Sequence, residues 1–311
     1  MSEKRATREA YGEALVELGH EFSNLVVLEA DLAKSTTTMK FKKEFPERFF
    51  DCGVAEQNMM AMAAGLATTG KICYTGSFAM FATGRAFEQI RNTVSYPKLN
   101  VKICPTHAGI TVGADGGSHQ TIEDIALMRV IPGMTVIVPA DFYEAKKAIK
   151  KAAQIDGPVF IRLGRATVPM LFDESYEFVP GQAVMLKEGT DVSVFATGIM
   201  VASSLEAAEA LEQQGISAEV INVSTIKPLD KETLIKSAQK TGKVVVAEEH
   251  SIIGGLGSAV AELLSDTYPV PMANVGIKDL FGRSGEPAEL LKYYGLTSED
   301  ISQAVQGLVS K

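Results

Sequence analysis

Short apolar runs alternate with amphipathic stretches along the first half of the chain, and this pattern predicts alternating strands and helices. Five runs are apolar nearly throughout, as in strands covered on both faces: 25–28, 72–75, 101–104, 135–138 and 159–162. Helical stretches lie between or beside them: 7–19, 56–69, 85–96, 122–130 and 141–154. Asp141 directly follows a strand and is expected to cap the next helix. The alternation predicts a mostly parallel sheet with helices on both faces.

A second series of the same kind follows a polar stretch. Residues 171–189 are polar, lack a helical period and contain Pro180 and Gly181, so we expect an interdomain linker there. Strands are then predicted at 192–196, 218–223 and 244–247, and helices at 199–214, at 231–240 and after Gly254-Gly255. The pattern therefore predicts two tandem α/β domains, 1–172 and 190–311, joined by a linker at 173–189.

Composition and charge narrow the functional classes. The chain has 311 residues, a formal net charge of −8 and a sequence pI near 5.2, which argues against a nucleic-acid partner. Cys52, Cys73 and Cys104 lie far apart in apolar runs, as expected of buried thiols in a reducing compartment. The first residues lack the apolar core of a signal peptide, and no run approaches the length of a membrane span. We therefore expect a cytoplasmic protein without a membrane partner.

The stretch DCGVAEQN places an acid, Glu56, at the start of an apolar helix. An acid in a first helical turn commonly does no more than complement the helix dipole. Here the helix continues as MMAMAAGLA, so a carboxyl group at its mouth would be poorly solvated without a specific partner. Such a helix is expected in a core or, as we favour, at a subunit interface.

Aromatic residues follow the predicted strand 72–75, at the sheet edge where parallel α/β folds bind ligands. Phe78 and Phe81 could form an apolar slot for a flat heterocycle, although simple core packing explains them equally well from the sequence.

The stretch THAGITVGADGGSHQ spaces His107, Asp115 and His119 along a loop that contains four glycines. Glycine lets the backbone approach a ligand closely, and loops on a rigid scaffold commonly carry function. Two histidines and an aspartate could also bind zinc, but their spacing matches no compact ligand pattern. We therefore expect a catalytic role and no metal ligands at these positions.

Three further polar residues lie near element ends, namely Arg8, Ser35 and Arg165. Each is unremarkable alone. If the fold brings them together at one edge of the site, the two guanidinium groups and the hydroxyl could hold a phosphate. The sequence contains no GxxxxGK, GxGxxG or Gly-Asp-Gly motif that would hold the phosphates of a cofactor. This half of a site implies a partner chain.

Taken together, these motifs resemble the C-terminal half of transketolases, which are thiamine-diphosphate enzymes, over nearly all of the chain. The resemblance implies a pyrimidine-binding domain followed by the transketolase C-terminal domain. It assigns Glu56 as the acid that hydrogen-bonds N1′ of the cofactor's aminopyrimidine, and Phe78 and Phe81 to the pocket around that ring. Asp31 corresponds to an acid near the cofactor, and Gly84 stands where several relatives have another aromatic residue.

The resemblance also assigns the substrate side. His107, Asp115 and His119 correspond to residues that bind substrate hydroxyls and phosphate, and the two histidines are expected to be catalytic by assisting proton transfer. The family's substrate-phosphate clamp corresponds to three residues: Arg8, Ser35 and Arg165. Glu249-His250 could suggest an acid–base pair, but the nearby Gly254-Gly255 indicates a loop-to-helix turn. In this family the second domain supports the dimer.

The implied activity is transfer of a two-carbon ketol unit from a ketose phosphate of the xylulose 5-phosphate type to an aldose phosphate of the ribose 5-phosphate type, as in the pentose phosphate pathway. A separate N-terminal subunit would hold the diphosphate and its Mg²⁺ or Ca²⁺, giving an α2β2 heterotetramer with a homodimeric core. The alternatives are a transketolase for branched sugar phosphates, a chain like deoxyxylulose-phosphate synthase, a 2-oxo-acid dehydrogenase β subunit, or a non-catalytic regulatory subunit.

Overall fold

The apolar runs of the first half form one seven-stranded sheet in the computed structural model, which describes residues 3–310. The strand order is β12-β6-β7-β5-β4-β2-β3, and all pairs are parallel except β12 with β6. The strands are β2 (Leu25–Glu29), β3 (Phe49–Asp51), β4 (Ile72–Gly76), β5 (Val101–Ile103), β6 (Thr135–Ile137), β7 (Val159–Ile161) and β12 (Thr225–Lys227). The predicted parallel sheet is confirmed, but β12 comes unexpectedly from the second half of the chain.

Helices cover both faces of this sheet because its side chains alternate between two apolar cores. Leu25 and Val27 face α1 (Thr7–Glu21), α2 (Met39–Glu44) and α5 (Phe142–Ala152). Val26 and Leu28 face α3 (Glu56–Ala67), α4 (Asp124–Arg129) and two π-helical segments, η2 (Met80–Arg85) and η3 (Gln89–Ser95). The helix expected at 85–96 corresponds to η3, which is π-helical, and η2 before it was not expected.

The second sheet has the order β14-β13-β10-β11-β9, and only β9 is antiparallel to its neighbour. Its strands are β9 (Val184–Lys187), β10 (Val192–Ala196), β11 (Ala218–Asn222), β13 (Val244–Ser251) and β14 (Met272–Ile277). One face packs on α6 (Met200–Glu212), α9 (Pro287–Tyr293) and α10 (Ser298–Val309), and the other on α7 (Lys231–Thr241) and α8 (Leu256–Thr267). Since β9 lies within 173–189, the expected linker is too long at its C-terminal end.

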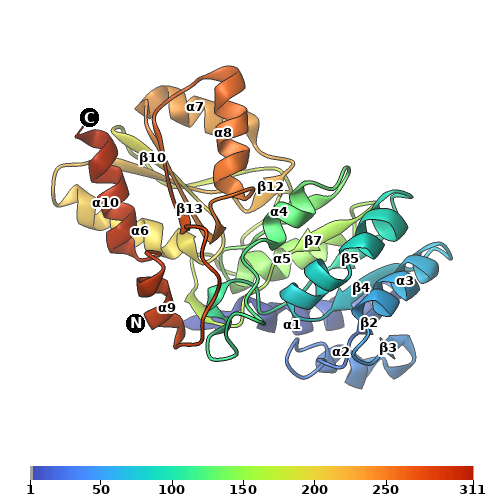
Figure 1. Cartoon of the computed structure of the whole chain (residues 1–311). Coiled ribbons are helices and arrows are strands. Elements are labelled where there is room, and N and C mark those ends of the chain that lie inside the picture. Colours follow the sequence, from blue (N-terminus) through green and yellow to red (C-terminus); the bar gives the residue numbers. More distant parts are fainter. Residues whose placement is uncertain (1–2, 311) are drawn as a thin grey trace.

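The two domains lie against each other (Figure 1), and one cluster of buried apolar side chains contains residues of both. Val136 of the first sheet and Phe195 of the second belong to the same buried cluster. Asp141 caps α5, as predicted, by accepting from the Glu144 amide at 2.8 Å, and its other oxygen accepts from the amides of Leu171 and Phe172. The connection between the domains is thus anchored to the first domain.

Short elements complete the fold. β1 (Lys4–Ala6) pairs with β8 (Thr167–Pro169) in a two-stranded antiparallel sheet, and single 3₁₀ turns lie at η1 (Pro46–Arg48) and η4 (Ile110–Val112).

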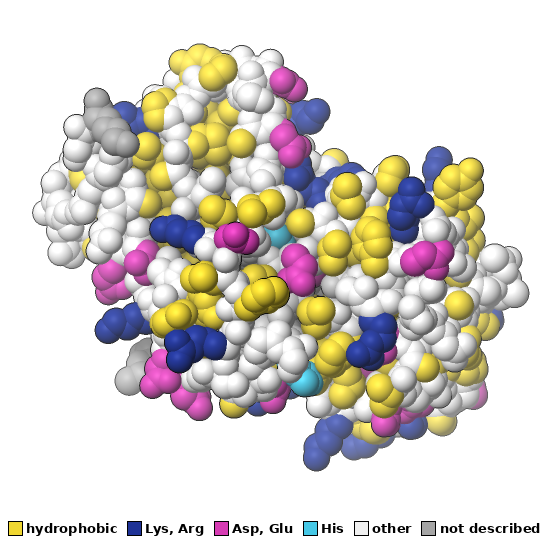
Figure 2. Space-filling model, in the orientation of Figure 1, with side chains coloured by type: hydrophobic (Ala, Val, Ile, Leu, Met, Phe, Trp, Pro, Cys, Tyr) yellow, Lys and Arg dark blue, Asp and Glu magenta, His cyan; other side chains and the backbone are white. Residues whose placement is uncertain are grey.

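A groove of about 810 Å³ runs between the domains. It is lined by residues of α4, β12, α7 and α8, and Figure 2 shows it as a hollow containing Lys and Arg side chains. Within residues 3–310, no helix is long and apolar enough to cross a membrane.

The three cysteines are free, and two of them are buried as expected. Cys73 and Cys104 lie inside the first domain, whereas Cys52 is partly exposed after β3. The expectation of three buried thiols is therefore wrong for Cys52, because it follows a three-residue strand at the edge of the sheet.

Candidate active site

The residues singled out from the sequence gather at the carboxyl edge of the first sheet. They follow β2, β3, β4, β5 and β7, and these ends meet because the five strands are parallel and adjacent. Arg8 joins them from the first turn of α1, where its own amide donates to Gly164 O at 3.3 Å. The sheet topology therefore brings together side chains that lie far apart in the sequence.

Glu56 begins α3 and is buried, with 1% of its surface exposed. Its Oε2 accepts from Arg85 Nη1 at 2.9 Å, and the half-exposed Arg85 guanidinium lies 4.9 Å above the centre of the Phe81 ring. A buried carboxylate requires such a partner, because an unpaired one is costly to remove from water. Arg85 thus links the acid to the predicted aromatic pocket.

Phe78 and Phe81 follow β4 and pack against both histidines of the glycine-containing loop. The Phe78 ring stacks on His107 with 3.9 Å between centroids, and Phe81 meets His119 edge to face at 5.2 Å. The two phenyl rings are nearly parallel, 19° apart in plane and 6.3 Å apart in centroid. The aromatic residues and the histidines therefore form one continuous cluster.

His107 is held in a left-handed backbone conformation, with φ of 60°, and is 3% exposed. Arg8 Nη1 approaches Nε2 at 3.4 Å, and Thr106 Oγ1 lies 2.7 Å from Nδ1. Because a guanidinium can only donate, Nε2 is the acceptor and Nδ1 carries the proton toward Thr106. Burial, reinforced by the charges of Arg8, Arg165 and His119, lowers the pKa of His107 to about 3. The imidazole is therefore neutral at physiological pH.

Two guanidinium groups face a small cavity of about 210 Å³ beside this cluster. Arg8 Nη1 donates to Ser35 O at 3.0 Å, and burial, followed by the charge of Arg165, lowers the pKa of Arg8. Arg165 Nη1 donates to Val112 O at 2.7 Å and to Asp115 Oδ2 at 3.2 Å. Two cations in one cavity fit a dianionic group, and residues 111–114, Ala166, Glu286 and Pro287 also line this space.

Main-chain groups of Ser35 and Asp31 make the contacts of these two predicted residues. Ser35 contacts the clamp through its main-chain carbonyl, whereas the sequence suggested its hydroxyl. Asp31 is exposed with φ of 61°, and its amide donates to Asp51 Oδ1 at 3.1 Å. Across residues 3–310, no three His, Cys, Asp or Glu side chains converge in a group that could hold a metal ion.

Sequence reasoning missed Arg85, Thr106 and the contribution of the second domain. Arg85 lies four positions after Phe81 on η2, a spacing that places both on one side of a helix. Thr106 directly precedes His107 and could have been proposed as its partner. Glu286 and Pro287 carry no motif, and only the packing of the second domain brings them to the cavity.

Comparison with known proteins decides the family. Residues 3–170 match the family model of the transketolase pyrimidine binding domain, and residues 181–301 match that of the transketolase C-terminal domain. A Methanocaldococcus jannaschii protein described as a transketolase C-terminal section is 53% identical over 99% of this chain and 97% of its own. The chain belongs to the transketolase family. Its resemblance to that family, expected from the motifs, is confirmed.

Two other relatives of this transketolase chain are informative. The 6-deoxy-6-sulfo-D-fructose transketolase subunit SqwH of a Clostridium species is 45% identical over 99% of this chain and 96% of its own. A solved structure titled "Split gene transketolase, inactive beta4 tetramer" has a TM-score of 0.90 and 57% identity, covering 98% of both chains. Transketolases are ketol-transferring enzymes that depend on thiamine diphosphate.

The site residues fit the pyrimidine end of that cofactor. An aminopyrimidine is flat and carries ring nitrogens, so it needs an apolar face and a hydrogen-bonding acid. The nearly parallel Phe78 and Phe81 rings provide the face, and the buried Glu56 carboxylate, whose counterion Arg85 is half exposed, provides the acid. These are the residues of this chain that would hold the ring.

Proposed function

We propose that this chain is the C-terminal subunit of a two-chain transketolase. With a separately encoded N-terminal subunit, it transfers a two-carbon ketol unit from a ketose phosphate of the xylulose 5-phosphate type to an aldose phosphate of the ribose 5-phosphate type. The observation that carries the proposal is the joint arrangement of the buried Glu56 carboxylate, the Phe78–Phe81 pocket and the Arg8–Arg165 cavity along one sheet edge.

Each group of this chain has a distinct task in the proposal. Thiamine diphosphate, when bound, supplies the nucleophilic carbon and the electron sink for cleavage of the carbon–carbon bond. Glu56 holds the pyrimidine ring through a hydrogen bond, and Phe81 covers its face. His107, which is neutral, and His119 bind substrate hydroxyls and assist proton transfer, while Asp115 accepts from a sugar hydroxyl. Asp31 lies near the cofactor, without a sharper role.

The phosphate clamp orients the sugar. Arg8 and Arg165 line a cavity of a size that suits one phosphate group, and Ser35 lies directly beside Arg8. Arg165 already holds Asp115, so binding of a phosphate would compete with that ion pair and release the carboxylate for a sugar hydroxyl.

A partner chain completes the site in this proposal. It would bind the diphosphate and its Mg²⁺ or Ca²⁺, and two copies of each chain would form an α2β2 assembly. The face of α3 that is not buried supports an interface beside Glu56, because it exposes Ala61, Met62 and Gly65. The inactivity stated for the β4 form of the split-gene relative also supports the need for a partner. The free thiols support a reducing compartment such as the cytoplasm.

A second candidate substrate is favoured by one relative. The SqwH protein is named for a sulfonated sugar, and a sulfonate is an anion that the same two arginines could hold. Branched sugar phosphates remain a third substrate class within the same reaction.

The test is reconstitution with a chain that carries Gly-Asp-Gly and a downstream Asn. We expect ketol transfer between xylulose 5-phosphate and ribose 5-phosphate only when both chains, thiamine diphosphate and Mg²⁺ are present. Sulfofructose and branched sugar phosphates are tested as donors in parallel, and pyruvate decarboxylation separates the 2-oxo-acid dehydrogenase alternative. Tight cofactor binding and turnover by this chain alone would contradict the two-chain proposal.

A further inference from the structure

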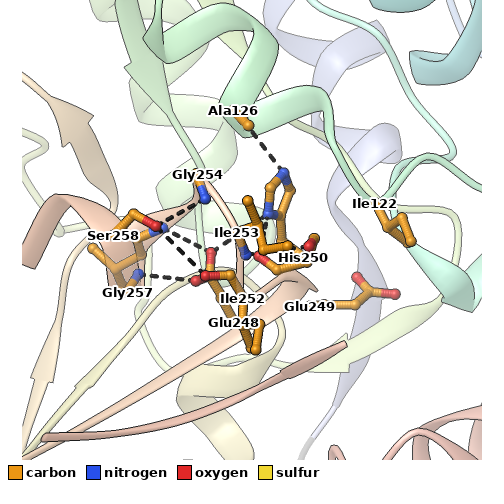
Figure 3. Close-up of polar contacts among 12 residues, drawn as sticks. Ile122, Ala126, Glu248, Glu249, His250, Ile252, Ile253, Gly254, Gly257 and Ser258 are labelled. Carbon is orange, nitrogen blue, oxygen red and sulfur yellow. Dashed lines mark hydrogen bonds and ion pairs between the residues drawn. The ribbon is translucent and has the colours of Figure 1, made fainter. Parts of the chain in front are cut away.

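Glu249 lies on β13 of the second domain and is 4% exposed. The side chains on either side of it along the chain contact two helices. Glu248 accepts from the amides of Leu256 and Gly257 at the start of α8, and His250 Nε2 accepts from the Ala126 amide in α4. In Figure 3 the Glu249 carboxylate points away from Glu248 and His250, toward the side where Ile122 lies. Its partners must therefore be sought in the first domain.

The carboxylate contacts the loop that carries the site histidines. Glu249 Oε1 accepts from the Thr111 amide at 2.8 Å, across 138 positions of sequence. Gly109 has φ of 80°, and a Cβ added there would lie 2.2 Å from the Glu249 carboxyl carbon. The loop backbone therefore comes so close to the carboxylate that only glycine fits at this point.

A buried ion network fixes the carboxylate itself. Arg162 Nη1 lies 3.7 Å from Glu249 Oε2, and its Nη2 donates to Glu249 O at 3.0 Å. Arg162 Nε donates to Asp124 Oδ2 at 2.8 Å, and Arg162 is 6% exposed. Asp124 begins α4, just after the loop, and Arg162 precedes Arg165 by three residues. Buried charges of this kind hold defined positions because separating them is costly.

The second domain holds the same loop at two further points. Gln120 Nε2 donates to Arg283 O at 2.9 Å, and the Ser251 amide donates to Ile122 O at 2.7 Å. Of these contacts, the one made by Glu249 lies nearest in sequence to the predicted substrate-binding residues, because Gly109 is two residues from His107 and Thr111 is four residues from Asp115.

We propose that Glu249 is a positioning residue for the transfer reaction: from the C-terminal domain, its carboxylate holds the Gly109–Thr111 turn and so sets where His107 and Asp115 stand. This gives the second domain a part in substrate binding. The inference rests on the proposed function for its kinetic consequence, whereas its structural part concerns the loop alone.

The experiment compares three variants in the reconstituted two-chain complex. Glu249→Ala removes the acceptor of the Thr111 amide, and kcat/KM for the ketose phosphate should fall about ten- to hundredfold, as when substrate-orienting groups are displaced by about 1 Å. Glu249→Gln keeps an acceptor oxygen and should recover activity to within about threefold of wild type. Glu248→Gln is the matched control, since it is equally buried on the same strand but caps α8.

Two further readouts separate positioning from general loss of structure. In Glu249→Ala, the affinity for thiamine diphosphate should stay within about twofold, because Arg85, and not the turn, holds Glu56. Hydrogen exchange of this chain alone should show that Glu249→Ala lowers the protection of the Thr111 amide about tenfold or more, whereas Glu248→Gln does not.

Three outcomes would overturn the inference: unchanged protection in Glu249→Ala, an equal fall of cofactor affinity and kcat/KM in that variant, or an equal loss of kcat/KM in Glu248→Gln. If the wild-type complex transfers no ketol unit, the proposed function fails, and the exchange data alone decide whether Glu249 holds the turn.

Discussion

Replacement of His107 by Asn should weaken the dependence of the unfolding free energy of this chain on pH below pH 7. Asn tolerates the left-handed backbone at this position, where φ is 60°, and its amide can still bond to Thr106, but it does not titrate. In the wild type, the pKa of His107 falls from 6.5 to about 3 on folding, because of burial and then the charges of Arg8, Arg165 and His119.

The sign and size follow from proton linkage. A depressed folded pKa means that the unfolded chain binds a proton more readily, so stability is fully present above pH 6.5 and is lost as pH falls toward 3. Between pH 7 and pH 4, this single group should cost the wild type about 3 kcal/mol of unfolding free energy. The His107→Asn variant should lack that loss, so the gap between the two proteins should shrink as pH falls.

The assay is urea unfolding at pH 7 and pH 4, followed by circular dichroism. His20→Asn is the matched control, because the His20 side chain is 60% exposed and contacts Glu44 outside the site cluster. This variant should show the same difference in unfolding free energy between pH 7 and pH 4 as the wild type. The chain has only four histidines, so the imidazole signals can also be followed by NMR. Equal pH dependence of wild type and His107→Asn, or titration of His107 near pH 6.5, would refute the reasoning.

Two further predictions concern the arginines of the site. Arg165→Met should raise KM for a ketose phosphate about ten- to hundredfold, since a charge-assisted hydrogen bond contributes about 1.5–3 kcal/mol, and should barely change turnover of the unphosphorylated ketose; equal changes for both sugars would contradict the clamp. Arg85→Gln should lower stability by about 1 kcal/mol, because the guanidinium is half exposed while Glu56 is buried. Thiamine diphosphate should then raise the melting temperature of the Arg85→Gln complex more than that of the wild type, and an equal rise would show that Arg85 and the cofactor do not share Glu56.

The elements that the sequence predicts correctly are those marked by a pattern of neighbouring residues, such as an apolar run or a helix cap. The apolar runs 25–28 and 192–196 correspond closely to β2 and β10, and Asp141 caps its helix as expected. β9 and β12 were missed because a strand of three or four residues at the edge of a sheet has too short a pattern to recognise. The π-helical turns of η2 and η3 likewise leave no distinct sequence period.

The same distinction applies to the site. Glu56, Phe78 and His107 could be proposed because each lies in a distinctive local motif. The partners that fix them could not, since Arg85 meets Glu56 across 29 positions and Glu249 meets Thr111 across 138. The sequence around Glu249 indicates a turn at Gly254-Gly255 and gives no sign of a contact with the first domain. That turn exists, with Gly255 preceding α8, yet the carboxylate contacts the opposite domain.

The most direct test of the account is the Glu56→Gln variant in the two-chain complex, because it keeps the size of the side chain at the start of α3 and removes only its charge and acid–base function. We expect assembly to persist while the rate of ketol transfer falls by about 10² or more. Transfer at a rate within tenfold of wild type would contradict the proposal that ketol transfer requires this buried carboxyl group and its hydrogen bond to the pyrimidine ring.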